Sequence, residues 1–308
     1  MQYVKQQLTE FVSSNLTDIY DDWNPDTVYT VEMDNNALTN ASMVRYGAFY
    51  YRSVTNDNKG YNPVQYENIK WVKHSVSNKF AMLDMSANSK SIIQNGSITV
   101  VFEQNNIELL GFGNYEAEYI EVELLAEDMT TVVWSKNTTS QINVNVYDYW
   151  DYIYAPYFNE SDHTETMVIP LLGTYVKVTF REQLFFERAS CGYLIGGSPV
   201  FMGNTLMGVT FGYNSFTSKE VTPFGNLEII KKGVQDLVDF ETVVPSNYLP
   251  RMRRELKSVY DEIVLFVLDE RENSPYENLM TLGVIQDAGV VLENPVESLM
   301  TFSIIEAV

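Results

Sequence analysis

Apolar and polar residues alternate through the middle of the chain, between residues 80 and 200. In the run YIEVELLAED, Ile120, Val122 and Leu124 are separated by glutamates. A period of two is typical of a strand with one buried and one solvated face. Similar short runs, such as SITVVFE and TYVKVTFRE, recur with turns rich in Asn, Ser and Gly between them. The pattern predicts an antiparallel β-sandwich over residues 80–200.

The C-terminal part, residues 201–308, combines strand patterns with one helix. The runs IVLFVLD, VIQDAGVVLE and LMTFSIIEAV are typical of strands. Before the first of them, apolar residues recur three or four positions apart, as on one face of a helix, and Ser246 or Asn247 is the expected cap. These apolar residues are Tyr248 or Leu249, Met252, Leu256 and Val259. The pattern predicts an α+β unit with one amphipathic helix on an antiparallel sheet.

Basic residues gather on the same predicted helix, away from its apolar face. They are Arg251, Arg253, Arg254 and Lys257. This is the densest positive patch in a chain that has 20 Lys and Arg against 41 Asp and Glu. Because arginine is enriched where protein interfaces are strongest, we expect Arg251 and Arg254 to lie in an interface.

The N-terminal part is shorter and more polar. A brief helical pattern at LTEFV ends near Asn24-Pro25, a turn dipeptide. Residues 1–25 are therefore predicted to form an arm or a short helix. Residues 26–79 have the pattern of short strands punctuated by Gly and Pro, which predicts a small β module. The chain as a whole is predicted to be mainly β.

Two aromatic positions flank a polar loop in YGAFYYRSVTNDNKGYNPVQYENIKWVKHSVSNKFAMLD, residues 46–84. Tyr50 and Tyr51 precede the loop, which is rich in Asn, Asp, Gly and Pro, and Trp71 follows it. Turn residues between two strand patterns predict a hairpin. We expect this hairpin to display its aromatic rings at the surface.

The densest aromatic run is VYDYWDYIYAPYF, residues 146–158. Alternation places such rings on both faces of a strand, so that some pack in a core and others stay outside. Outward Tyr and Trp are common anchors of protein interfaces. Core packing combined with a protein interface is favoured over a ligand platform. The interface candidates are Tyr149, Trp150, Tyr152 and Tyr154.

The composition argues against several classes of partner. A formal net charge of −21 in 308 residues opposes binding to nucleic-acid phosphates and to anionic membrane surfaces. No stretch approaches the ~20 apolar residues of a membrane span, and no leader pattern opens the chain. The single cysteine, Cys191, fits folding in a reducing compartment. We expect a soluble protein, made in the cytoplasm, that neither binds nucleic acid nor inserts into a membrane.

Residues able to carry catalysis are sparse. His74 and His163 lie in polar segments without a third metal ligand at suitable spacing. Cys191 lies in an apolar strand pattern, where a free cysteine is usually a small buried hydrophobe. Carboxylate pairs are expected by chance in so acidic a chain. The sequence therefore predicts no catalytic residue, no metal site and no cofactor.

The hairpin segment resembles the small carbohydrate-binding module of the chitin-binding type. The matching residues are Tyr50, Tyr51, Gly60, Pro63 and Trp71. In that family exposed aromatic rings stack on sugar faces, so the resemblance implies this role for Tyr51 and Trp71, with Tyr61 and Tyr66 nearby. Aromatic rings on a small hairpin also suit protein docking, and the sequence leaves sugar binding and partner binding both open.

Four further landmarks follow in order, and they read SNKFAMLD, YWDYIYAPYF, CGYLIGG and TPFGNLEI. Together with the module they resemble a family of tailed-bacteriophage tail proteins over most of residues 27–308. The resemblance implies a virion structural protein of the tail, near the baseplate or receptor-binding apparatus, made in the host cytoplasm. It would be present in several copies and bound to other tail proteins. A host-glycan-binding adhesin is an alternative, and a glycan-degrading enzyme is a more distant one.

Overall fold

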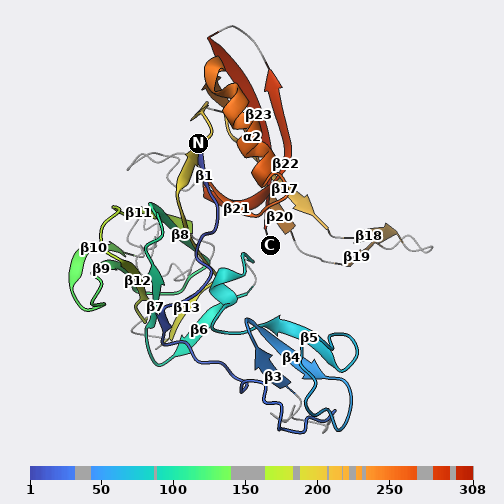
Figure 1. Ribbon diagram of the computed structural model, residues 1–308. Helices are drawn as coiled ribbons and strands as arrows, with labels where there is room; N and C mark the ends of the chain where they lie inside the picture. Colours follow the sequence, from blue (N-terminus) through green and yellow to red (C-terminus); the bar gives the residue numbers. More distant parts are fainter. Residues whose placement is uncertain are drawn as a thin grey trace, which may run out of the picture.

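Strands dominate the fold, and they pair antiparallel in several sheets (Figure 1). The computed structural model describes all residues except 32–42, 87–88, 140–163, 183–187, 207, 217, 222–226, 231–233, 269–279, 292–295 and 308. Within the described part of the chain there is one α-helix, and it lies in the C-terminal unit. The prediction of a mainly β protein with one C-terminal helix is confirmed.

The middle of the chain forms two sheets around one core. The five-stranded sheet has the order β10–β9–β12–β7–β2, and the three-stranded sheet has the order β11–β8–β14. Val122 and Val178 of the first sheet share a buried cluster with Phe112 and Leu194 of the second. The bounds are β2 Ser13–Ser14, β7 Ile98–Glu103, β8 Leu109–Gly113, β9 Tyr119–Leu125, β10 Val132–Thr139, β11 Thr164–Val168, β12 Tyr175–Phe180 and β14 Tyr193–Gly197.

The outward face of the five-stranded sheet pairs charges across strands. Lys177 Nζ lies 2.6 Å from Glu123 Oε2, and Arg181 Nη2 lies 3.0 Å from Glu121 Oε2. Partly exposed pairs of this kind contribute at most about 1 kcal/mol each, so the buried face supplies most of the stability. A further two-stranded sheet joins β6 to β13, and a short 3-10 helix, η2, precedes it. Their bounds are η2 Ala81–Leu83, β6 Ser91–Gln94 and β13 Arg188–Cys191.

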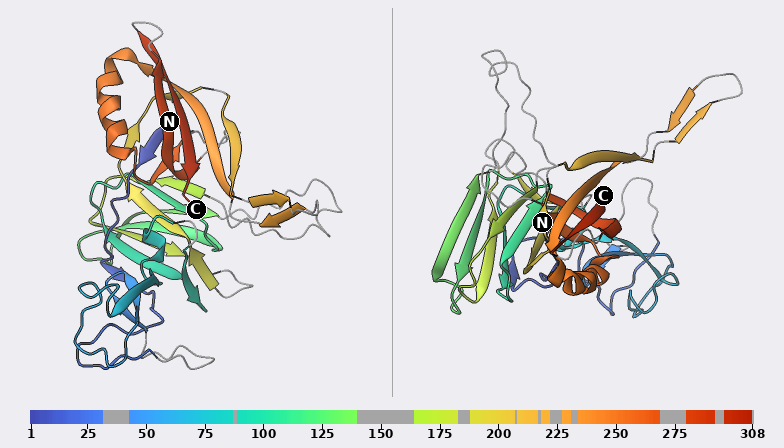
Figure 2. Two further views of the ribbon diagram at one scale, coloured as in Figure 1. Left: turned by 90° about the vertical axis from the view of Figure 1, so that its right-hand side faces the viewer. Right: turned by 90° about the horizontal axis from the view of Figure 1, so that it is seen from above.

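An eight-stranded sheet forms the C-terminal unit. Its order is β15–β1–β21–β22–β23–β20–β16, and β17 also pairs with β20. Figure 2 shows the long strands of this sheet standing beside the helix. The bounds are β1 Gln2–Val4, β15 Pro199–Phe201, β16 Asn204–Thr205, β17 Thr210–Ser215, β20 Val234–Pro245, β21 Val264–Val267, β22 Met280–Val291 and β23 Glu297–Glu306.

Helix α2 (Leu249–Val259) covers one face of this sheet. Beneath it, the rings of Phe240 and Phe302 stack with their centroids 5.2 Å apart. The apolar residues that recur at helical spacing in the sequence are therefore the residues that the helix buries against the sheet. The buried helix residues are Leu249, Met252, Leu256 and Val259.

The start of α2 differs from the predicted cap. Ser246 and Asn247 belong to a 3-10 turn, η3 (Ser246–Tyr248), and no side chain caps the helix. The Ser246 hydroxyl hydrogen-bonds instead to the hydroxyl of Ser298, 3.0 Å away, which ties the turn to β23. A proline in the first helical turn supplies the start signal, since its missing N–H is not needed there.

The N-terminal residues form an arm with two short strands; of the predicted arm or short helix, the helix is not formed in residues 1–25. Strand β1 lies between β15 and β21, and β2 pairs with β7 of the sandwich. Between them Leu8 is buried in the sandwich core and Phe11 packs against it. The apolar run LTEFV is too short to sustain a helix without tertiary support, and its apolar side chains are held by the sandwich. The N-terminal arm thus belongs to two units.

A three-stranded sheet forms the small module at the lower end of the molecule in Figure 1. It consists of β3 (Met43–Tyr46), β4 (Phe49–Ser53) and β5 (Trp71–Val76). At the other side of the body, β18 (Ser218–Val221) and β19 (Leu227–Ile230) form a two-stranded hairpin. Figure 2 shows this hairpin projecting away from the rest of the molecule.

The sandwich and the C-terminal sheet share an apolar junction. Val4 and Leu265 of the sheet are buried in one cluster with Leu109 and Ile195 of the sandwich. Gly111 of β8 approaches Leu265 so closely that a Cβ at Gly111 would overlap the Cδ2 methyl group. The absence of a side chain at Gly111 therefore leaves room for the Leu265 methyl group in the junction.

We expect Gly111→Ala to lower the free energy of unfolding, because the added methyl overlaps Leu265. Leu265→Ala alone leaves a cavity and is expected to cost about 2–5 kcal/mol. In the double variant the new methyl occupies part of that cavity, so the loss is expected to be smaller than the sum of the two single losses. Urea denaturation followed by circular dichroism measures all three.

Gly96→Ala is the control, because a Cβ there meets only Ile93, at an ordinary contact distance of 3.5 Å. It should change the unfolding midpoint little. Strictly additive losses in the double variant would show that Gly111 and Leu265 do not share the junction contact.

Candidate docking surfaces

The aromatic residues of the predicted hairpin form a core. Trp71 has no exposed surface, and Tyr51 and Tyr50 are 3% and 4% exposed. Trp71 meets Tyr29 edge-on with 5.1 Å between ring centroids, and its indole N–H donates to the Tyr61 carbonyl at 2.8 Å. The expectation that this hairpin displays Tyr50, Tyr51 and Trp71 at the surface is therefore wrong.

The size of the module explains this burial. A sheet of three short strands has room for few core residues, and large aromatic rings exclude the most water per residue. Within the described residues, the buried cluster of the module contains Tyr29, Val44, Tyr51 and Trp71. Trp71 therefore serves as the centre of the module, and a sugar has no access to its ring.

Tyr50 joins the module to its surroundings. Its hydroxyl donates to Asp18 Oδ1 at 2.9 Å and accepts hydrogen bonds from the backbone N–H groups of Ile19, at 3.1 Å, and Asn78, at 3.3 Å. Burial raises the pKa of this tyrosine. The side chain therefore fixes the arm and the link after β5 to the module, and it also lines a pocket of about 760 Å³ beside them.

Tyr61 and Tyr66 are the predicted binding residues that keep access to solvent. Tyr61 is 36% exposed and Tyr66 is partly exposed. Their rings meet edge-on with centroids 4.9 Å apart, and Lys70 Nζ lies 5.1 Å from the centroid of Tyr61. Of the five module residues expected to bind a sugar or a partner, these two lie where one could reach them.

A groove lies at the junction between the module and the sandwich. It has a volume of about 730 Å³, and four partly exposed aromatic rings line it. Phe11 and Phe80 have ring centroids 5.5 Å apart, and Trp23 meets Tyr46 edge-on at 5.8 Å. The charged groups along it are Glu10, Asp22, Arg45 and Lys79.

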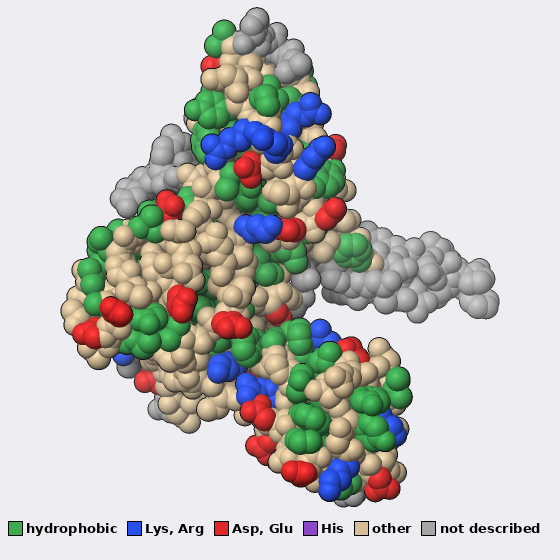
Figure 3. Space-filling view, viewed as in Figure 1, with side chains coloured by type: hydrophobic (Ala, Val, Ile, Leu, Met, Phe, Trp, Pro, Cys, Tyr) green, Lys and Arg blue, Asp and Glu red, His purple; other side chains and the backbone are tan. Residues whose placement is uncertain are grey.

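Arg45 holds one side of this groove in place. Its Nε donates to Asp22 Oδ1 at 2.6 Å, and its Nη1 lies 3.0 Å from Asp18 Oδ2. The backbone of Arg45 also bonds to Asp21 and Trp23 of the arm, at 2.8 Å each. Figure 3 shows basic and acidic side chains close together where the module joins the body. The groove is thus built by segments that tertiary contacts bring together.

The basic residues predicted on the helix lie at the surface. Arg251 and Arg254 are exposed on α2, and Figure 3 shows Lys and Arg side chains gathered over this helix. Arg251 Nε lies 4.0 Å from Glu255 Oε1, one turn along the helix. The other predicted interface residues, Tyr149, Trp150, Tyr152 and Tyr154, lie outside the described residues.

Of the residues considered for catalysis or metal binding, Cys191 and His74 lie in the described part of the chain. Cys191 is fully buried, and burial raises the pKa of its thiol well above the usual range. His74 is exposed, and His163 lies outside the described residues. In the part of the chain that the structure describes, no group of His, Cys, Asp or Glu is placed to hold a metal ion. No helix in that part is long and apolar enough to cross a membrane.

Comparison of the chain with protein-family models, curated proteins and solved structures gives no match. The resemblance seen in the sequence motifs therefore stays a prediction.

Sequence reasoning missed the junction groove. Trp23 lies in the polar cluster DDWNPD and Phe80 in SNKFAMLD, at opposite ends of the module in the sequence. Nothing local indicates that the two segments meet. One signal was available: both rings lie outside the alternating strand patterns, so the sequence pattern did not assign them to a buried strand face.

We expect Trp71→Ala to unfold the module while the rest of the chain stays folded. Loss of a fully buried tryptophan costs about 3–5 kcal/mol, and the small aromatic core has little else to replace it. Limited proteolysis with mass mapping should show new cleavage between residues 43 and 76. Tyr61→Ala is the matched control, since its ring is partly exposed and its removal should leave the cleavage pattern unchanged. A protected module in Trp71→Ala would contradict the assignment of this ring as its centre.

Proposed function

We propose that this protein is a non-catalytic structural component of a tailed-bacteriophage tail, in the baseplate or receptor-binding apparatus. Several copies dock onto other virion proteins through exposed parts of the β units. The ordered sequence landmarks support this proposal. The single structural observation that carries it is the edge strand β17 with the hairpin that follows it.

Strand β17 has features of a surface that is covered in an assembly. Phe211 and Tyr213 are 56% and 76% exposed, and Phe216 just beyond the strand is 49% exposed. Large exposed apolar patches mark interaction sites, and tyrosine is enriched at interfaces. The hairpin β18–β19 continues from this strand, and an isolated two-stranded hairpin is at best marginally stable in water. Contact with a neighbouring virion protein would stabilise it.

We expect the polypeptide to be present in purified particles of the phage that encodes it, in more than one copy per tail. Mass spectrometry of gradient-purified virions, with isotope-labelled standards, measures the copy number. A phage carrying Phe211→Ser and Tyr213→Ser should incorporate less of the protein, because the exposed rings no longer contribute to docking.

Tyr248→Ser is the control for this experiment, since Tyr248 is also exposed, at 50%, but lies at the start of α2. Its incorporation should match that of the unaltered protein. Absence of the unaltered polypeptide from purified virions would refute the proposed function.

Glycan binding is a second candidate function, and the junction groove favours it. Aromatic rings beside carboxylate, guanidinium and ammonium groups offer both stacking and hydrogen bonds, which a sugar ring requires. The buried hairpin residues Tyr51 and Trp71 no longer supply this argument. Phe11, Trp23, Tyr46 and Phe80 take their place.

We expect any glycan binding to be lost in Phe80→Ala, because this ring lines the groove and belongs to none of the buried core clusters. Binding to a glycan array, followed by calorimetry with the best ligand, measures the loss. Tyr61→Ala is the control and should keep its affinity. The reverse result would place the sugar at the polar loop, and silence of the unaltered protein on the array would refute this second function.

A further inference from the structure

The C-terminal sheet has an open acidic face on the side opposite α2. In β20 the even-numbered residues Val238 and Phe240 are buried toward the helix, so Asp239 and Glu241 point to the other side. The sandwich covers that other side at β1 and β21, through the junction that contains Val4. The strands β22, β23, β20 and β17 continue beyond the junction, and a shallow pocket of about 350 Å³ lies on them.

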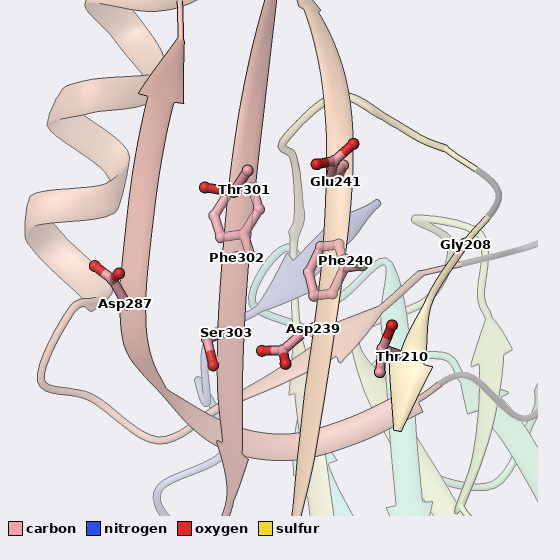
Figure 4. A pocket seen from close by; sticks show the side chains of 9 residues that line it. All are labelled: Gly208, Thr210, Asp239, Phe240, Glu241, Asp287, Thr301, Phe302 and Ser303. Carbon is pink, nitrogen blue, oxygen red and sulfur yellow. The ribbon is translucent and has the colours of Figure 1, made fainter. Parts of the chain in front are cut away.

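Strand register aligns the polar groups of this face. Ser303 pairs with Asp239 on one side and with Asp287 on the other, and Asp239 also pairs with Thr210. Figure 4 shows these four side chains in a line across the neighbouring strands. Glu241, with Thr301 beside it, lies one step further along the strands. A β-bulge between Ile285 and Asp287 turns Asp287 outward, where it joins this acidic row.

The carboxylates of this face lack cationic partners within the described residues. Asp239, Glu241 and Asp287 form no ion pair there, and no Lys or Arg lines the pocket. Asp239 and Glu241 are two residues apart on β20, and Asp287 lies two strands away, at about 10 Å, so their like charges repel one another through solvent. A cationic surface placed against them would lower that repulsion.

The outer side of α2 carries the complementary charge. Arg253, Arg254 and Lys257 are exposed and form no ion pair with described carboxylates. Arg253 and Arg254 precede Lys257 by four and three residues, so each lies next to Lys257 on the exposed side of the helix. The helix lies between this basic stripe of three residues and the sheet, so the basic stripe and the acidic row face opposite directions in one molecule. They cannot pair within one copy.

We propose that the basic stripe of α2 in one copy docks onto the acidic row of the C-terminal sheet in a second copy. A contact between two different patches is heterologous, so repetition produces a ring or a short filament. This inference rests on the proposed function, in which several copies lie side by side in a tail, and it specifies how two of those copies would contact each other. The occupant of the acidic face is therefore a second copy of this chain.

The contact is expected to be weak in free solution. A helix of 11 residues is about 16 Å long, so it covers less surface than a standard interface buries. We expect a dissociation constant on the order of 100 μM for such a small interface. Sedimentation velocity at increasing concentration of the full chain should therefore show a rising average mass.

Two charge-reversal variants test the contact. The helix variant carries Arg253→Glu and Arg254→Glu, and the sheet variant carries Asp239→Lys and Asp287→Lys. Each should weaken self-association by more than about tenfold, because like charges then face each other. A 1:1 mixture of the two should associate again, because the acidic helix of one variant fits the basic sheet of the other. Only a heterologous contact between these two patches produces that recovery.

Controls separate this effect from net charge and from misfolding. Lys59→Glu with Lys136→Glu changes the charge by the same amount as the helix variant, at exposed sites of the module and the sandwich. Glu118→Lys with Glu127→Lys matches the sheet variant in the same way. Both controls should self-associate like the unaltered chain. Circular dichroism and thermal unfolding should be unchanged in all four variants.

Carbodiimide coupling adds a direct readout. In a mixture of ¹⁴N- and ¹⁵N-labelled protein, Lys257 should form hybrid cross-links to Asp239, Glu241 or Asp287. A chain that stays monomeric at all concentrations overturns the inference, as does association that neither variant weakens or that mixing does not restore. These results are independent of whether the protein is found in virions. Absence from virions would refute the proposed function and leave the self-association result standing.

Discussion

The arrangement of the sandwich and the C-terminal sheet depends on the pairing of strand β1. This strand is three residues long, yet it lies between β15 and β21 and so joins chain segments that are far apart in sequence. Alternation directs Tyr3 into the core under α2 and Val4 into the junction with the sandwich. The N-terminal ammonium donates to the Gly203 carbonyl at 2.7 Å and fixes the end of the strand. Through this strand the beginning of the chain completes the sheet that the end of the chain builds.

The module follows a different rule, because it is small. Its stability comes from a few aromatic rings, so residues that could have served for recognition are used for folding. Tyr50 extends this role outward, since its hydroxyl binds the arm and the link that leads to the sandwich. The surface left for recognition then lies at the edges of the module, in the junction groove and on the Tyr61–Tyr66 pair. Folding demands in a small domain thus decide where a binding surface remains.

Charge is divided unevenly over an acidic molecule. The chain has 41 Asp and Glu against 20 Lys and Arg. On the C-terminal sheet, however, carboxylates gather on one side while arginines and a lysine gather on the opposite side of the covering helix. This separation gives the unit two faces of opposite charge, which the proposed contact between identical copies requires. The exposed aromatic residues of β17 lie at the edge of the same sheet and extend the surface available for docking.

The local sequence pattern was enough to predict the elements that have one buried face and one exposed face. The alternation around Val122 and the helical spacing of Met252 and Leu256 correspond to buried faces, because one repeat in sequence produces one face in space. Only the tertiary structure decided how these elements combine. Backbone groups of β1 take partners from distant strands, which overrides the brief helical pattern that follows it. Likewise, the sequence identified Trp71 as an important aromatic residue but did not decide whether its ring is buried or exposed. That depends on which other side chains pack around it. The groove and the acidic row were unpredictable for the same reason, because their members come from segments that meet only after the chain has folded.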